Sequence, residues 1–317
     1  MTKRRLHVKK KTKSGLSWVE QAKRQLPFWV MLAIPIVYFA LFKYWSWFGI
    51  AIAFQDYKLG DPFIGAGSRW VGLKWFKLFF KSPFVWRWIK NTLLISVNTL
   101  IFSFPAGIFL ALLFNEIKNL KFREAATTIS MLPHFVSTVV VVGILHNLFS
   151  VQGGIVNQVI EKLGGNAIDF MGSSKWFRPL YIGSGIWQGT GFASLVYIAA
   201  ISGIDPGLYE AAKMDGANRW KQMWHVTLPC ILPTIITMFI LKLGNLMSVG
   251  AEKILLMYSP AIYETADVLS TYAYRAGILD GKTSLSTAIS LMNSVVNLIV
   301  LVTANKVSRK VSETSLW

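Results

Sequence analysis

The sequence is short of several residue types, and each shortage excludes a class of protein. Its single cysteine, Cys230, rules out an intramolecular disulfide framework and a multi-cysteine zinc site. It contains no Gly-x4-Gly-Lys-Ser/Thr loop, so it lacks the phosphate cradle needed to hydrolyse ATP. The four histidines (His7, His134, His146 and His225) have no metal-ligand spacing. We therefore expect neither a catalytic centre nor a bound metal or other cofactor in this chain.

Charge is also scarce, and the scarcity is greatest for acidic residues. Only 15% of the residues are charged, against roughly 25% in soluble domains. The 33 Lys+Arg outnumber the 15 Asp+Glu, and nine of the basic residues fall within the first 24 positions. No nucleic-acid-binding signature accompanies this tail, and contact with anionic lipid explains it more simply. Residues 1–26 are predicted to be a basic N-terminal tail retained in the cytoplasm.

Apolar residues make up 53% of the chain, and they gather into long runs. Several runs approach the ~20 residues needed to cross ~30 Å of hydrocarbon. The predicted fold is an all-α integral membrane protein whose six-span domain covers residues 27–304, with 305–317 as a cytoplasmic C-terminal tail. The predicted spans are Phe28–Ala53, Thr92–Phe114, Ala125–Phe149, Pro179–Ile201, Pro233–Gly250 and Leu285–Ala304. An even number of spans places both termini in the cytoplasm of a multi-pass cell-membrane protein.

The interval between the first two predicted spans mixes aromatic and basic residues. Its aromatic residues include Trp70, Trp75, Phe76, Phe79, Phe80, Phe84, Trp86 and Trp88. This mixture favours a short amphipathic helix at the level of the lipid headgroups.

The segment 204–229, between the fourth and fifth predicted spans, has the pattern of two short helices joined by a bend. Asp205 is a good N-cap, and Pro206 suits the first helical position. The Asp215-Gly216 pair is a turn signal that ends the first helix. An apolar face at Trp220, Met223 and Trp224 predicts the second helix, and Leu228-Pro229 is expected to end it before the fifth span.

The same segment resembles a known family. Glu210-Ala211-Ala212, three residues, Gly216, nine residues, Val226, one residue and Leu228-Pro229 match the EAA signature of binding-protein-dependent ABC importer permeases, apart from Val226, where Ile is commoner. Further stretches, among them 132–135, 252–260, 264–268 and 312–317, look like the polysaccharide-type, LplB-like branch of carbohydrate permeases with a MalF-like fold. The resemblance covers nearly the whole chain.

The resemblance implies a transport subunit that is not itself an enzyme. In the family, the matching loop docks into a groove of a cytoplasmic ATPase, and ATP with its Mg²⁺ binds on that partner. The implied coupling residues are Glu210, Ala211, Ala212, Asp215, Gly216, Leu228 and Pro229. The implied partners are a second and different permease chain, two ATPase subunits and an extracellular solute-binding lipoprotein. The implied substrate is an oligosaccharide or related carbohydrate, and nucleic acid has no role.

Polar residues inside the predicted spans are candidates for the substrate pathway, because exposing them to lipid is costly. Ser286, Ser290, Asn293 and Asn297 fall within a stripe of about 60° on the sixth span. Trp187, Gln188 and Gly191 are the candidates on the fourth span. The same residue types also bond helices to one another, so packing is an equal alternative. Lys242 and Lys43 also lie in spans, where snorkelling competes with substrate contact.

Two other functions are compatible with a six-span chain. A self-sufficient secondary transporter or channel would require intramembrane carboxylates and inverted repeats, and neither is found in the predicted spans. A membrane-embedded enzyme would require a convergent nucleophile, base or metal cluster. The preferred interpretation remains half of the translocation pathway of an ATP-driven carbohydrate importer.

Overall fold

A computed structural model describes residues 18–58, 60–62, 69–312 and 315–316. The basic residues predicted to form the N-terminal tail lie mostly within 1–17, outside the described residues. In chain order the elements are α1 (Trp18–Phe39), η1 (Ala40–Tyr44), η2 (Trp45–Phe54), β1 (Gln55–Asp56), β2 (Arg69–Trp70), α2 (Lys74–Phe80), α3 (Val85–Glu116), α4 (Leu120–Met131), η3 (Leu132–Phe135), α5 (Thr138–Phe149), α6 (Ile155–Lys162), α7 (Ser174–Ser202), α8 (Pro206–Met214), α9 (Arg219–Gln222), η4 (Met223–Thr227), α10 (Leu228–Leu243), α11 (Ala251–Met257), η5 (Pro260–Ile262), α12 (Tyr263–Ala266), α13 (Leu269–Tyr274), η6 (Arg275–Leu279) and α14 (Thr283–Ser312).

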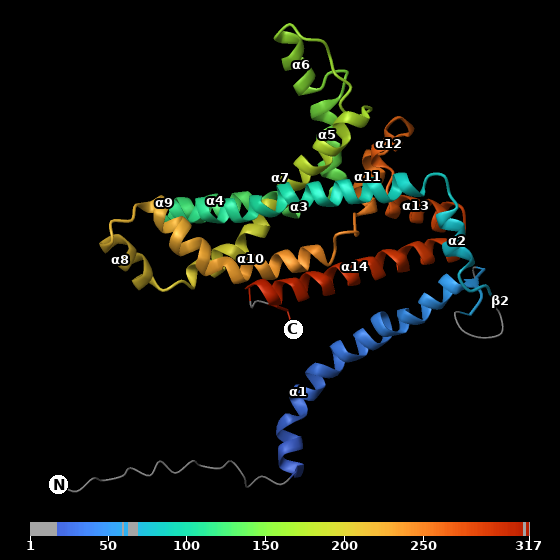
Figure 1. The fold of residues 1–317 in the computed structure, drawn as a ribbon, viewed down its shortest axis with the longest axis horizontal. Helices are drawn as coiled ribbons and strands as arrows, with labels where there is room; N and C mark the ends of the chain where they lie inside the picture. Colours follow the sequence, from blue (N-terminus) through green and yellow to red (C-terminus); the bar gives the residue numbers. More distant parts are fainter. Residues whose placement is uncertain (1–17, 59, 63–68, 313–314, 317) are drawn as a thin grey trace.

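The fold is an elongated helical bundle, which confirms the predicted all-α class. Helices α3, α4, α7, α10 and α14 run along the long axis (Figure 1). Helices α8 and α9 lie at one end of the bundle, and α2 and α13 lie at the opposite end. In the described ranges the strands form one antiparallel pair, with Gln55 opposite Trp70 and Asp56 opposite Arg69.

Among the described residues, four segments are continuous helices long and apolar enough to cross a membrane: Gln25–Phe54, Val85–Glu116, Arg219–Leu243 and Thr283–Lys310. Two further spans exist only if bent pairs are counted. Leu120–Phe135 with Thr138–Phe149 is bent by 96°, and Ser174–Ser202 with Pro206–Met214 by 72°. The described chain thus has four to six candidate spans, and the exact count of six stays a prediction.

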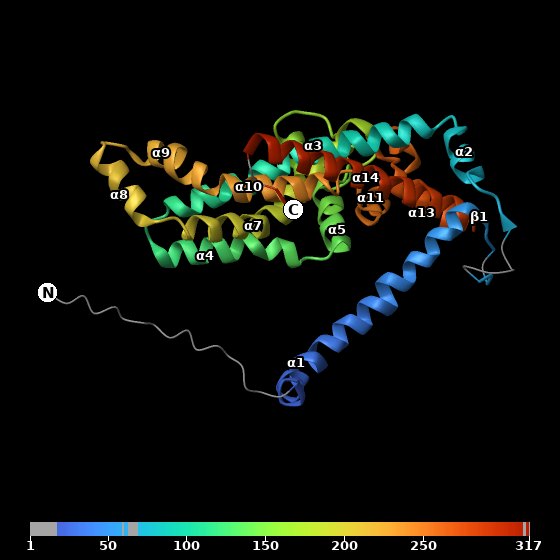
Figure 2. The same ribbon diagram turned by 60° about the horizontal axis from the view of Figure 1, so that its bottom comes forward.

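The first candidate span stands apart from the rest of the bundle. In both ribbon views α1 diverges from the other long helices and joins them only at its far end (Figures 1 and 2). None of its apolar window is buried inside the chain. Its end, η2, packs against α14, where Ile52 and Ala53 become buried. This helix therefore offers its apolar surface to lipid or to another chain.

The third predicted span, Ala125–Phe149, is not one straight helix. It breaks at residues 132–137, where Pro133 is the second residue of the short turn η3 and Ser137 caps the next helix through its side chain. Helix α5 then leaves the long axis of the bundle (Figure 1). A proline cannot donate a backbone hydrogen bond, and this explains why the helix breaks here.

The fifth span also departs from the prediction. Leu228-Pro229 does not end a helix, because α9, η4 and α10 form one continuous segment from Arg219 to Leu243. Pro229 comes two residues after the π-helical turn η4, where the helix departs from the regular i→i−4 hydrogen bonds and so accommodates a residue without an N–H. The helix ends at Leu243, and residues 244–250 are not helical although the predicted span extends to Gly250. Helix α14 continues through Ser312, beyond the predicted limit at Ala304.

The aromatic residues between the first two spans differ in exposure, and Trp75 and Phe76 are half-buried. Trp70, Phe80, Phe84 and Trp86 are exposed, as an anchor at the headgroups requires. Phe79 and Trp88 are instead buried in the core at the opposite end, and Trp88 stacks on Tyr272 at a centroid distance of 3.6 Å. The prediction of an interfacial helix is therefore wrong for these two residues, because α2 and the start of α3 fold back onto α13 and α14.

Candidate functional site: the exposed hairpin and the polar pocket

The 204–229 hairpin folds locally as its residues predict. The Asp205 side chain accepts a hydrogen bond from the Gly207 N–H at 2.9 Å and caps α8, with Pro206 in the first turn. Gly216 follows the helix with φ +75°, a left-handed conformation that costs glycine little. The Asn218 side chain then caps α9 by accepting from the Lys221 N–H at 2.9 Å. The bend is thus built into the backbone.

Arg219 ties this hairpin to the bundle, and one hydrogen bond braces the hairpin internally. Within the hairpin, the hydroxyls of Tyr209 and Thr227 lie 2.9 Å apart and join α8 to η4. Arg219 pairs with Glu116 at the end of α3, at 3.4 Å. Movement of the hairpin would therefore be passed to α3 and to the segment that continues into α10.

The outer surface of α8 is exposed and lacks partners within the described chain. Glu210 and Ala211 are exposed, and the structure shows no ion pair or hydrogen bond for the Glu210 carboxylate among the described residues. Met214 has 89% of its surface exposed, at the tip of the hairpin. An apolar tip beside a free carboxylate is a surface suited to binding another protein. The sequence interpretation does not include Met214.

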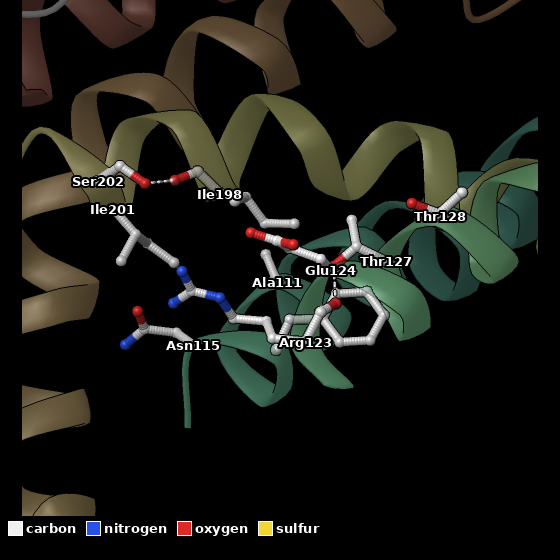
Figure 3. A pocket seen from close by; sticks show the side chains of 10 residues that line it. Ala111, Asn115, Arg123, Glu124, Thr127, Thr128, Ile198, Ile201 and Ser202 are labelled. Carbon is white, nitrogen blue, oxygen red and sulfur yellow. Dashed lines mark hydrogen bonds between the residues drawn. The ribbon is translucent and has the colours of Figure 1, made fainter. Parts of the chain in front are cut away.

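A small pocket lies behind the hairpin, between α3, α4 and α7 (Figure 3). It has a volume of about 270 Å³. Arg123 and Glu124 contribute opposite charges to its wall, and in Figure 3 Arg123 extends toward Asn115 and Ile201. Because both signs of charge are present, this pocket has no evident preference for a charged ligand.

A second pocket, which we call the polar pocket, lies nearer the middle of the bundle. Its volume is about 240 Å³. Its wall is made by α3, α7, the end of α10 and the non-helical residues 245–250. The lining residues are Ile95, Ser96, Thr99, Leu100, Ser103, Phe104, Tyr181, Lys242, Asn245, Leu246, Ser248, Val249 and Gly250. Non-helical backbone at membrane depth is tolerated where it lines a cavity, as it does in this pocket.

The predicted pathway residues of α14 support this pocket from behind. The Asn297 Oδ1 atom accepts from the Met247 N–H and its Nδ2 donates to the Ser248 hydroxyl, both at 2.8 Å. The Asn293 Nδ2 atom donates to the Met247 carbonyl at 3.0 Å. Ser286 bonds the Ala273 carbonyl, and Ser290 is exposed. These asparagines hold the 244–250 segment in place and do not line the pocket.

The predicted pathway residues of α7 lie at the bend of the third span. The Gln188 Nε2 atom donates to the Val136 carbonyl at 2.9 Å, which satisfies a backbone group freed by the break. Gly191 allows close packing there, because a Cβ atom would come within 1.9 Å of the Ser130 carbonyl oxygen. Trp187 is exposed and lines neither pocket. The structure therefore does not bring the α7 and α14 candidates together.

The pocket residues on α3 are not among the candidates identified from the sequence. Ser96, Thr99 and Ser103 recur at intervals of three and four, the same helical signal that singles out the α14 stripe. The apolar residues around these three hydroxyls make α3 look like an ordinary lipid-facing span, so the polar face is easily overlooked in the sequence. The Ser96 and Thr99 hydroxyls are buried and have no hydrogen-bond partner among the residues that the structure describes.

A buried carboxylate organises the opposite end of the bundle. Asp267 is fully buried. Its two carboxylate oxygens accept five hydrogen bonds: from the Trp88 indole at 2.7 Å, the Tyr258 and Thr271 hydroxyls at 2.9 Å, Arg275 at 3.0 Å and Arg87 at 3.4 Å. Burial raises the pKa of Asp267, and the hydrogen bonds from Trp88 and Thr271 oppose this effect. A set made up only of donors favours the ionised form. This Asp267 cluster joins α3 to α13 and η6.

Comparison with known proteins identifies the family. Residues 103–313 match the family described as binding-protein-dependent transport system inner membrane component. The polygalacturonan/rhamnogalacturonan transport system permease protein YteP of Bacillus subtilis (strain 168) is 42% identical over 290 residues, covering 91% of this chain and 89% of that protein. Protein LplB of the same organism is 39% identical over 304 residues, covering 96% and 95%.

Solved structures agree with the sequence comparison. A chain in the crystal structure of a bacterial alginate ABC transporter, in complex with an alginate pentasaccharide-bound periplasmic protein, superposes with a TM-score of 0.85 at 40% identity. The match covers 94% of this chain and 99% of that chain. These findings confirm the resemblance seen in the EAA segment. The chain belongs to the binding-protein-dependent transport system inner membrane components, as a multi-pass permease subunit of an ABC carbohydrate importer.

Proposed function

We propose that the 204–229 hairpin is the part of this permease to which a cytoplasmic ATPase binds. The observation that carries the proposal is the exposed outer surface of α8, where Glu210, Ala211 and Met214 lack intrachain partners among the described residues. Glu210 would pair with a basic residue of the ATPase, and Ala211 and Ala212 would allow close approach. Asp215 and Gly216 form the bend that presents them, and Leu228-Pro229 joins the hairpin to the fifth span.

The proposed assembly contains a second, different permease chain, two ATPase subunits that bind ATP and Mg²⁺, and an extracellular solute-binding lipoprotein. The isolated position of α1, with none of its apolar window buried, supports packing against the second permease. In the proposed assembly the chain is oriented so that the hairpin and both termini face the cytosol, where the ATPase subunits lie. The relatives named for polygalacturonan and alginate support an oligosaccharide derived from a polysaccharide as the substrate.

The assembly is tested by purifying the tagged full-length chain from its native host and reconstituting it in vesicles. We expect an ATPase and a second permease to copurify, and we expect carbohydrate uptake to require ATP and the binding protein. Robust uptake by the chain alone would contradict the proposal, because it would identify a self-sufficient transporter.

The docking surface is tested at its apolar tip. Met214→Glu places a charge where an apolar contact is expected, and it should lower the amount of copurified ATPase at least tenfold. Leu163→Glu is the matched control, since Leu163 is 82% exposed but lies directly after α6, away from the hairpin. Equal recovery of ATPase with Met214→Glu and with the unaltered chain would place the docking surface elsewhere.

A further inference from the structure

The polar pocket contains a cation but no anion. Lys242 lies in the last turn of α10 and lines the pocket, and none of the lining residues is Asp or Glu. Lys242 has no ion pair within the part of the chain that the structure describes. The pocket behind the hairpin, in contrast, contains both Arg123 and Glu124. The polar pocket thus has an uncompensated positive charge.

The pocket also lies at a depth where such a charge is costly. Ser96 to Ser103 are about 16 to 27 Å from the start of α3 at 1.5 Å per residue, within a helix of 32 residues. The hydrocarbon core is ~30 Å thick, so this stretch falls in its middle part. A lysine at this depth normally has a partner or faces a water-filled cavity. Lys242 is exposed within the described chain, so it faces either water in the pathway or a partner that the described residues do not supply.

Two hydroxyls in the same wall also lack partners within the described part of the chain. The side-chain oxygens of Ser96 and Thr99 are buried without a hydrogen bond to any described residue, and Ser96 is only 8% exposed. Leaving such groups unpaired is unfavourable, so they indicate a missing polar ligand. Asn245, which also lines the pocket, donates only a long hydrogen bond of 3.3 Å to the Leu241 carbonyl.

The remaining wall suits a sugar ring. Tyr181 contributes an aromatic side chain from α7, and Lys253 holds it by donating to its carbonyl at 3.1 Å while lying 5.0 Å from its ring. The volume of about 240 Å³ corresponds to roughly eight water molecules at about 30 Å³ each. That space accommodates one monosaccharide unit of a longer chain.

We propose that the polar pocket binds a carboxylate-bearing sugar unit, a uronate, and that Lys242 pairs with its carboxylate while Ser96 and Thr99 bond its hydroxyls. Lys242 is then a residue that makes the pathway selective for acidic oligosaccharides. The inference rests on the proposed function, since it requires that the carbohydrate passes between α3, α7 and α10.

The competing explanation is that Lys242 only interacts with the C-terminal end of α10 or extends toward the headgroups. The two explanations differ in the charge inside the pocket. A cysteine placed at Ser103 can report that charge, because the chain has a single native cysteine, Cys230, which Cys230→Ser removes. The purified complex is then labelled with a pair of small methanethiosulfonate reagents, one anionic and one cationic.

We expect the anionic reagent to modify Ser103→Cys faster than the cationic one, and Lys242→Gln to reduce that preference about tenfold. Lys242→Arg should keep it, and Lys43→Gln should not change it, since Lys43 lies in the separate first span. A galacturonate trisaccharide should protect the cysteine from labelling, whereas its carboxyl-reduced form should not. A reagent preference unaffected by Lys242→Gln, or equal protection by both sugars, would overturn the proposal.

Uptake measurements separate this inference from the proposed function. If the unaltered complex with its binding protein imports no carbohydrate, the proposed function fails. If it imports galacturonate oligosaccharides equally well with Lys242 or Lys242→Gln, only the role of the pocket fails. The labelling result decides the charge of the pocket in either case.

Discussion

Replacing Gly216 by valine is expected to uncouple ATP hydrolysis from transport while the chain still inserts into the membrane. Gly216 has φ +75°, and a left-handed conformation costs other residues about 1–2 kcal/mol. A β-branched side chain is among the least tolerated there. Relieving the strain would alter the bend between α8 and α9 and displace Glu210 from its position. We expect carbohydrate uptake by the reconstituted complex to fall about tenfold or more.

Two further substitutions separate backbone strain from a general loss of structure. Gly216→Asn should retain most of the uptake, because asparagine tolerates the left-handed region. Gly203→Ala is the matched control at the end of α7, where the backbone has φ −87° and an added Cβ meets only ordinary contacts. Normal uptake by Gly216→Val would show that the bend does not present the docking surface.

Replacing Asp267 by asparagine is expected to destabilise the opposite end of the bundle strongly, although the two side chains have nearly the same shape. All five groups donate to the carboxylate. The Tyr258 and Thr271 hydroxyls could accept from an asparagine NH₂ group, but the neutral amide oxygen would face the indole and both guanidinium groups without a negative charge. The charges of Arg87 and Arg275 would lose their common partner. Breaking a buried pair in this way costs roughly 3–5 kcal/mol. The thermal unfolding midpoint of the purified complex and its yield should both fall.

The control for this effect is Asp280→Asn. Asp280 forms an exposed pair with Lys282 at 3.6 Å, and such pairs contribute about 0–1 kcal/mol. Its substitution should leave the unfolding midpoint nearly unchanged. If Asp267→Asn behaves like Asp280→Asn, the Asp267 cluster does not hold α3 against α13 and η6.

Local features are predictable because their signals lie within a few neighbouring residues. Asp205 and Pro206 begin α8, and Gly216 ends it, since capping and backbone conformation depend mainly on nearby atoms. The prediction that Leu228-Pro229 ends a helix fails, although it rests on equally local signals. The helix continues through Pro229, because the π-helical turn η4 just before it accommodates the proline. The bend of the third span has a local signal in Pro133, but its angle of 96° depends on contacts with α7.

The polar residues show most clearly where prediction from sequence ends. The stripe on α14 is recognisable, but its asparagines bond the 244–250 backbone, and the hydroxyls that line the polar pocket belong to α3. Helical periodicity indicates that a face avoids lipid, yet it does not tell which neighbour that face meets.

The sequence by itself determined the all-α membrane class, the family and the position of the bent hairpin, because hydropathy, capping and motif spacing are properties of contiguous residues. Only the tertiary structure decided which side chains meet: Asp267 with its five donors, Asn297 with the non-helical residues 244–250, and the exposed Lys242 with two hydroxyls that lack partners among the described residues. The physical reason is that these contacts join residues far apart in the chain, and packing between helices sets their geometry.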